Sequence, residues 1–264
     1  MKAIAAAFEA VRSDGRRAAL MPYLMGGFPD LDTSRAIGWA YADAGADLVE
    51  LGVPFSDPLA DGPVIHAAAT RALRAGATLH HVLEVGARLA HRLPVVLMCY
   101  ANPMLARGVE RFADELAVRR ISGLIVPDLP LEEAPSVLAA CDAAGIALVP
   151  LVAPTTPDDR LAAIGARARG FLYTVSVTGT TGERSGGDSA ELIARAKAST
   201  AVPVALGFGI STPDQAAAAA GAGADGVIVG SRLVRAAAEA ADAGADAAAA
   251  AGSVVAELAA GLAR

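Results

Sequence analysis

Aromatic residues, lysine and cysteine are scarce in this chain. Only 4% of its 264 residues are aromatic, and it has two cysteines. Cys99 and Cys141 lie in or beside apolar runs without the spacing of a zinc site or a disulfide framework, so we expect buried, reduced thiols. The lysines are Lys2, near the N-terminus, and Lys197, within a predicted helix. Because neither follows a predicted strand, Schiff-base chemistry and attachment of pyridoxal phosphate to this chain are not expected.

Positive charge and long apolar runs are also limited. The 22 basic and 28 acidic residues give a net charge of −6, so the chain lacks the cationic excess typical of nucleic-acid binding. No apolar run reaches the ~18 residues of a membrane-spanning helix, and Glu9 and Asp14 stand in the N-terminal segment, where a signal peptide carries no acid. We therefore expect a cytoplasmic protein that binds neither nucleic acid nor membranes.

Histidine is rare as well, and its positions do not favour a metal site. The four histidines lie in segments predicted to be helical after the second strand, and adjacent residues on a helix point about 100° apart. They are His66, His80, His81 and His91. We expect solvated or capping histidines and no metal on this chain.

Short apolar segments alternate with longer alanine-rich segments along the whole chain, as in repeated βα units. Most of the short segments are continuous apolar runs, which favours parallel strands buried on both faces. Eight strands are predicted, at residues 20–25, 47–52, 94–100, 123–126, 147–152, 170–176, 202–206 and 226–229. Eight units in about 250 residues predict an α/β fold, a single (β/α)8 TIM barrel with extra helices over residues 1–264. A doubly wound open sheet is the competing architecture.

Two segments near the C-terminus need separate interpretation. Residues 221–226, GAGADG, match a dinucleotide-binding fingerprint, but an alanine run precedes them and a predicted strand follows. That order is the reverse of the one a phosphate-binding helix requires, so we interpret the segment as a helix stop. From residue 235 onward the chain is nearly all alanine and predicts a helix packed outside the barrel.

Reacting groups of a βα barrel lie at the carboxyl ends of its strands. The segment 50–63, ELGVPFSDPLADGP, follows the second strand and is rich in carboxylates, proline and glycine. Glu50 is surrounded by apolar neighbours, so its pKa should rise, as suits a general acid–base; a solvent-facing Glu50 is the alternative. Asp57 and Asp61 are either a pair of metal ligands or loop and capping groups, one of which also contacts substrate, and Asp61 stands at the start of a predicted helix.

Glycines after the last two predicted strands indicate a phosphate site. Gly207 and Gly209 follow the seventh strand, and Gly230 and Ser231 follow the eighth. Barrels often bind phosphate between these two loops through backbone N–H groups and a helix N-terminus. The long Gly-, Thr- and Ser-rich segment 178–189 is predicted to be a mobile lid, with an ordinary surface loop as the alternative.

Six motifs occur in the order found in one known family. ELGVPFSDPLADGP, MCYANP, IVPDLP, TGTTG, GFGIS and VGS extend over nearly the whole chain, and the first is long and specific. The chain closely resembles the tryptophan synthase alpha subunit. The resemblance implies a carbon–carbon lyase that cleaves indole-3-glycerol phosphate to indole and glyceraldehyde 3-phosphate by a retro-aldol reaction.

The resemblance also assigns roles to residues at matching positions. Glu50 would be the general acid–base. Asp61 would accept a hydrogen bond from the indole N–H and stabilise positive charge on that nitrogen. The implied substrate-binding positions are Tyr23, Ile65, Met98, Tyr173, Thr181, Gly182, Gly209, Gly230 and Ser231. Tyr23 stands where some members have phenylalanine. The additional hydroxyl group of Tyr23 would alter packing around the indole ring.

The resemblance further implies a partner, the beta subunit, in an alpha2beta2 complex. The beta subunit would carry pyridoxal phosphate and receive indole through an internal tunnel, while this chain would carry no cofactor. Asp128 and Pro103 lie in loops that the family uses near that interface. A free-standing lyase and a noncatalytic phosphate-sensing activator stay open as alternatives. A triose phosphate type of isomerase would need a strand-end lysine and histidine, which the chain lacks.

Overall fold

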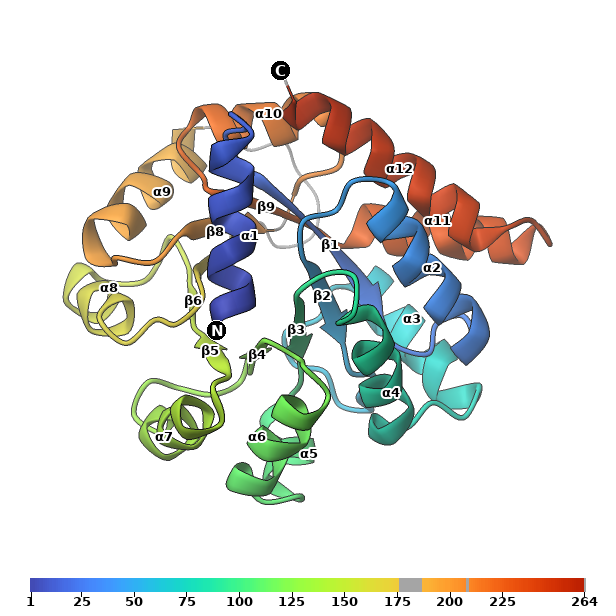
Figure 1. Ribbon diagram of the computed structural model, residues 1–264, viewed down its shortest axis with the longest axis horizontal. Helices are drawn as coiled ribbons and strands as arrows, with labels where there is room; N and C mark the ends of the chain where they lie inside the picture. Colours follow the sequence, from blue (N-terminus) through green and yellow to red (C-terminus); the bar gives the residue numbers. More distant parts are fainter. Residues whose placement is uncertain (176–186, 208, 264) are drawn as a thin grey trace.

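The computed structural model describes residues 1–175, 187–207 and 209–263, apart from the side chains of residues 187 and 188 (Figure 1). Its strands are short and almost entirely buried, because each is covered on both faces. They are β1 (Ala19–Met25), β2 (Val49–Gly52), β3 (Val95–Met98), β4 (Gly123–Ile125), β5 (Ala147–Val149), β6 (Leu151–Val152), β7 (Leu172–Val175), β8 (Val204–Gly207) and β9 (Gly226–Val229). All eight predicted strands are present, with ends that differ by a few residues.

The sheet closes on itself at Pro150. All strand pairs are parallel, in the order β5-β4-β3-β2-β1-β9-β8-β7-β6. β5 pairs with β4 and β6 pairs with β7, so the predicted strand 147–152 is divided between the two ends of this order. Proline has no N–H to donate, whereas the Pro150 carbonyl accepts a hydrogen bond from the Tyr173 N–H at 3.0 Å. The predicted (β/α)8 barrel is therefore confirmed, and the open-sheet alternative is wrong.

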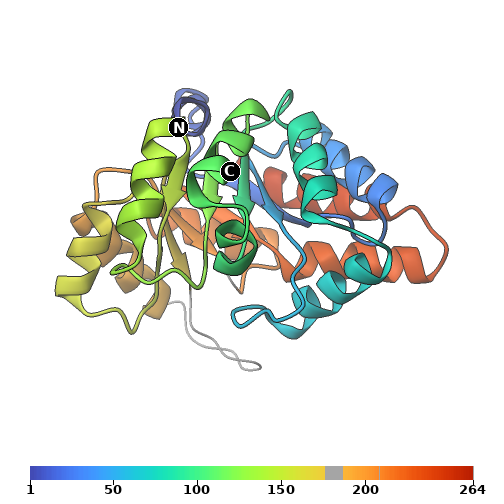
Figure 2. The same cartoon turned by 90° about the horizontal axis from the view of Figure 1, so that it is seen from below.

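Helices surround this barrel, and Figure 2 shows the strands enclosed between them. The helices of the described residues are α1 (Lys2–Ser13), α2 (Leu31–Asp43), α3 (Pro63–Arg74), α4 (Leu79–Leu89), α5 (Ala101–Leu105), α6 (Val109–Val118), α7 (Ala134–Ala144), α8 (Asp158–Gly165), α9 (Gly187–Ser199), α10 (Pro213–Gly221), α11 (Ser231–Asp242) and α12 (Ala247–Leu262). Within the described residues, none of them combines the length and apolarity needed to cross a bilayer.

The alanine-rich C-terminal segment differs from the prediction. It forms two helices, α11 and α12, in place of one, because Gly244 adopts a left-handed φ of +68° and Asp246 caps the next helix. The predicted helix stop at 221–226 is confirmed, since α10 ends at Gly221, Gly223 has a φ of +100° and β9 begins at Gly226.

Helix α1 covers the amino ends of the strands (Figure 1). Its buried face packs into the apolar interior of the barrel through Ile4, Phe8 and Val11. Ile4 lies against Gly123 at the start of β4, and Phe8 lies against Gly226 at the start of β9. With this end filled by apolar side chains, the polar groups of the interior gather at the carboxyl ends of the strands.

Candidate active site

A cavity of about 560 Å³ lies at the carboxyl ends of the strands. Nine of the predicted site residues line it: Tyr23, Glu50, Asp61, Ile65, Met98, Tyr173, Gly209, Gly230 and Ser231. The other two, Thr181 and Gly182, lie in segment 176–186, outside the described residues, as does most of the predicted lid. The barrel thus brings together residues that are up to about 200 positions apart in the sequence.

Glu50 is buried in β2 and faces this cavity. It pairs in register with Tyr23 on β1, and its exposed fraction is 1%. Its Oε2 atom has no hydrogen-bond partner among the described residues. Burial, and then the negative charge of Asp61, raise the pKa of Glu50 to about 8, while the Tyr173 hydroxyl opposes part of the rise. The predicted upward shift is confirmed, the solvent-facing alternative is wrong, and Glu50 is poised to give or take a proton near neutral pH.

Asp61 is held by a tyrosine and does not cap a helix. The N-cap of α3 is Gly62, so the predicted capping role is wrong. The Tyr100 hydroxyl donates to Asp61 Oδ1 at 2.9 Å and accepts from the Ala60 N–H at 2.9 Å. Burial raises the pKa of Asp61, whereas the Tyr100 hydrogen bond and the charge of His66 oppose the rise. One oxygen of this carboxyl group is therefore fixed at the cavity wall.

Asp57 does not join Asp61 as a metal-ligand pair. Its side chain is exposed and accepts a hydrogen bond from the Ser56 hydroxyl at 2.5 Å. Among the residues that the structure describes, no group of three His, Cys, Asp or Glu side chains is placed to hold a metal ion. The two aspartates of this loop thus have different environments.

Two residues that shape the site, Tyr100 and Gly52, were not predicted from the sequence, and a third, Gly207, was given another role. Tyr100, in the MCYANP motif, positions Asp61 and stacks on Phe55 with ring centroids 5.3 Å apart. A Cβ atom on Gly52 would lie 2.0 Å from the Tyr23 hydroxyl oxygen, and one on Gly207 would lie 2.3 Å from the Tyr173 ring. Gly207 therefore makes room for a tyrosine, a role that differs from its predicted place in a phosphate loop. A glycine at the end of a buried strand was the available signal.

The N-terminus of α11 is open to an anion, whereas that of α10 is not. In α10, Thr212 and Gln215 form a capping box that binds the N–H groups of both residues, Pro213 has no N–H, and Asp214 adds negative charge to the first turn. In α11 the N-cap is Gly230, with no side-chain cap, so the N–H groups of Ser231 and its neighbour are available. Gly209, with a φ of +81°, lies in the adjacent loop on the same cavity. This end of the cavity suits a phosphate group.

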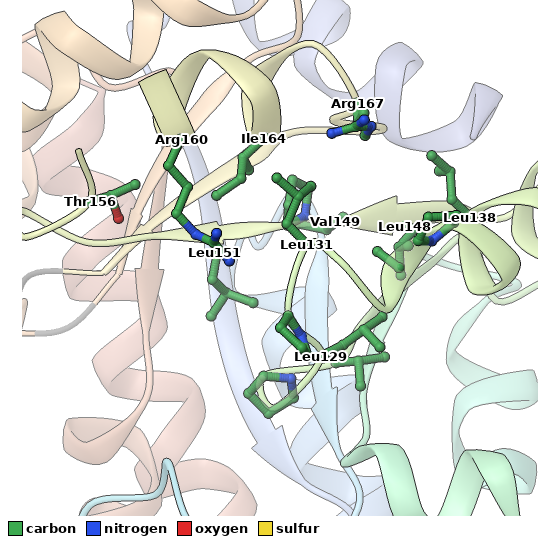
Figure 3. A pocket seen from close by; sticks show the side chains of 16 residues that line it. Leu129, Leu131, Leu138, Leu148, Val149, Leu151, Thr156, Arg160, Ile164 and Arg167 are labelled. Carbon is green, nitrogen blue, oxygen red and sulfur yellow. The ribbon is translucent and has the colours of Figure 1, made fainter. Parts of the chain in front are cut away.

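A second cavity, of about 220 Å³, lies on the outer side of the barrel near α7 and α8. It shares Pro127 and Leu151 with the first cavity. Arg160 extends from α8 toward Leu151 (Figure 3) and is bound by both oxygens of Glu132. No carboxyl side chain lines this cavity, and none of the predicted site residues reaches it. The acid–base groups belong to the first cavity alone.

The scarce reactive side chains lie away from the cavity. Lys197 donates to the Gly223 carbonyl and pairs with Asp225 near the amino end of the barrel. Cys99 and Cys141 are free and buried, as predicted, and burial raises the pKa of both thiols to about 12. Of the histidines, His66 lies in α3 and His80 and His81 in α4, but His91 follows the end of α4 and so falls outside its predicted helix.

Barrel enzymes gather their reacting groups at this end of the sheet. The closed sheet and the cavity at the carboxyl ends of its strands place the chain among the (β/α)8-barrel enzymes. Residues 8–262 match the family model described as "Tryptophan synthase alpha chain", and the chain belongs to that family.

Similar proteins extend over most of the chain. It is 51% identical over 242 residues to the tryptophan synthase alpha chain of Prochlorococcus marinus (strain MIT 9313), covering 90% of this chain and 88% of that protein. It is 52% identical over 241 residues to that of Synechococcus sp. (strain CC9902), covering 90% and 89%. A structure of Mycobacterium tuberculosis tryptophan synthase superposes with a TM-score of 0.91 at 40% identity, covering 98% of this chain and 97% of that one. The barrel is therefore shared at the level of sequence and of structure.

Proposed function

We propose that this chain cleaves indole-3-glycerol phosphate to indole and glyceraldehyde 3-phosphate as the alpha subunit of a tryptophan synthase, with residues 1–264 acting as one barrel domain. The observation that carries this proposal is the buried Glu50, which faces the cavity with a pKa of about 8 and with one carboxyl oxygen that has no hydrogen-bond partner among the described residues. Such a group is protonated in much of the enzyme at neutral pH and can still act as a base in the next step.

The reaction needs one proton delivered and one removed. Glu50 protonates the ring carbon that bears the side chain. Asp61 accepts a hydrogen bond from the indole N–H and stabilises the positive charge that develops on nitrogen. The Glu50 carboxylate then removes the proton of the adjacent hydroxyl group. As that oxygen becomes an aldehyde, the carbon–carbon bond breaks and its electrons return to the ring, which leaves neutral indole. The indole ring serves as the electron sink, so no Schiff base is required.

The rest of the cavity fits the two ends of this substrate. Tyr23, Ile65 and Met98 supply apolar surface to the cavity wall, and Tyr23 pairs in register with Glu50. Gly209, Gly230 and Ser231 surround the open N-terminus of α11, where we place the phosphate. Tyr173 stands beside Glu50, and we assign Thr181 and Gly182 to closure over the bound substrate on the resemblance alone.

Two loops at the carboxyl end support a protein partner, which we propose to be the beta subunit in an alpha2beta2 complex. Asp128 accepts a hydrogen bond from the Ala101 N–H at 2.8 Å and so joins the loop after β4 to the start of α5, which contains Pro103. Leu105 on α5 and Leu59 in the loop after β2 have exposed fractions of 58% and 88%. Exposed leucines are suited to burial in an interface, and Leu59 directly precedes Ala60, which lines the cavity.

The cofactor of the complex is assigned to that partner. Pyridoxal phosphate requires a lysine, and neither lysine of this chain is among the residues that line the cavity. The chain therefore carries no cofactor in this proposal, and the beta subunit carries pyridoxal phosphate. We also propose a cytoplasmic location, which the free thiols of Cys99 and Cys141 support because reduced cysteines persist in reducing compartments.

The test is an indole-release assay with indole-3-glycerol phosphate, with and without the beta subunit. We expect the wild-type chain to release indole, at a higher rate with beta, and Glu50→Gln to lose at least ~100-fold in kcat while it still binds glycerol phosphate. Turnover by Glu50→Gln close to the wild-type rate would refute the acid–base role. High activity of the isolated chain that beta does not change would favour a free-standing lyase, and binding without any turnover would favour an activator.

A further inference from the structure

The charged residues of the cavity wall come from two parts of the chain. Glu50 and Asp61 lie on β2 and the loop that follows it, while Arg232 and Arg235, both on α11, are the arginines among the described residues that line the cavity. Arg232 is half-buried and Arg235 is exposed. A substrate with an anionic group at one end fits this distribution of charge.

Neither arginine has a protein partner in the described part of the chain. Several other arginines form close ion pairs there, including Arg16 with Asp47 at 2.6 Å and Arg195 with Asp158 at 2.7 Å. No ion pair or side-chain hydrogen bond joins Arg232 or Arg235 to any described residue. Within the described residues, both guanidinium groups are therefore free to bind a ligand.

The position of these arginines in α11 is unfavourable in the empty protein. With Gly230 as N-cap, they are the second and fifth residues of the helix, three apart and on one face. The helix dipole opposes a cation in the first turn, where Arg232 lies, and the first turn of α11 contains no acidic residue to offset it. A sequence that breaks a local rule in this way without a structural gain points to a functional role.

A bound phosphate would remove this conflict. It would accept hydrogen bonds from the first N–H groups of α11 and pair with guanidinium groups, which match two phosphate oxygens at once. We propose that Arg232 and Arg235 are substrate-binding residues that select the phosphorylated form of the substrate, with Arg232 bound to the phosphate and Arg235 attracting it at the cavity mouth. The identity of the phosphate ester rests on the function proposed above, whereas the anion site does not.

The experiment compares Arg232→Gln, Arg235→Gln, the double variant and Arg232→Lys with the wild type. Arg88→Gln is the matched control, because Arg88 is an exposed arginine on α4 that does not line the cavity. Two quantities are measured: the KM and kcat for indole-3-glycerol phosphate, and the Kd for inorganic phosphate by titration calorimetry at low and moderate salt.

We expect Arg232→Gln to raise both KM and Kd about tenfold and Arg235→Gln to raise them about threefold, with kcat within twofold of the wild type. Arg232→Lys should recover most of the affinity, since it keeps the charge. The melting temperature of ligand-free Arg232→Gln should equal or exceed that of the wild type, which excludes misfolding as the cause.

Two outcomes separate this inference from the proposed function. If the wild type cleaves indole-3-glycerol phosphate but the double variant changes KM and Kd by less than twofold, the arginine assignment is overturned and the function stands. If the wild type is inert toward that substrate yet the variants lose phosphate affinity as described, the function is wrong and the anion site stands.

Discussion

The raised pKa of Glu50 predicts that this residue destabilises the fold as it ionises. A carboxyl group whose pKa is higher in the folded state binds its proton more tightly there, so stability falls as pH rises from the unfolded pKa toward the folded one. The two values are 4.5 and about 8, which place the loss between about pH 4.5 and pH 8. Between pH 5.5 and pH 7.5 the loss amounts to about 2.5 kcal/mol. Glu50→Gln removes it, because an amide does not titrate.

The assay is a series of thermal melts of wild type and Glu50→Gln across this pH range. For a chain of this length, ~2.5 kcal/mol corresponds to a shift of about 5 to 10 °C in melting temperature. We expect the melting temperature of Glu50→Gln minus that of the wild type to increase by this amount from pH 5.5 to pH 7.5. Any pH-independent cost of burying the amide cancels in that change. Glu257→Gln is the control, because Glu257 is exposed on α12.

A difference that stays constant across this pH range would refute the argument. It would mean that Glu50 titrates alike in the folded and unfolded states, and hence that its environment does not raise its pKa. If this difference in melting temperature were larger at pH 5.5 than at pH 7.5, its change with pH would have the opposite sign. That result would show that the folded state favours the carboxylate form of Glu50. In either case Glu50 would lose the property that suits it to deliver a proton near neutral pH.

Two further predictions concern neighbours of the catalytic groups. Gly207→Ala places a methyl group 2.3 Å from the Tyr173 ring. We expect thermal melts to show a loss of about 1–3 kcal/mol in the free energy of unfolding, and kinetics to show a loss of at least ~10-fold in kcat/KM. The control is Gly221→Ala, which has open space around its Cβ and should leave both quantities nearly unchanged. Tyr100→Phe removes the hydrogen bond that lowers the pKa of Asp61, so the acidic limb of the kcat/KM profile should move to higher pH, and an unchanged limb would contradict the positioning role of Tyr100.

The fold was predictable because its signal is local. Continuous apolar runs at regular spacing indicate parallel strands, and their number indicates a closed barrel. The place of closure was not predictable, because Pro150 lies inside one apolar run and only the pairing of β5 and β6 with different neighbours divides that run in two. The break between α11 and α12 has a local signal, Gly244, that the surrounding alanines obscured.

The sequence by itself determined that Glu50 would stand at the end of a buried strand with a raised pKa, since its neighbours along the chain are apolar. Only the tertiary structure decided what Asp61 does, because its partner Tyr100 is 39 residues away and reaches it when β2 and β3 pair. The same holds for Arg232 and Arg235: their helix was predictable, but their position on the wall of the cavity that Glu50 and Asp61 also line follows from barrel closure. Local chemistry sets what a residue can become, whereas long-range contacts set which groups it meets.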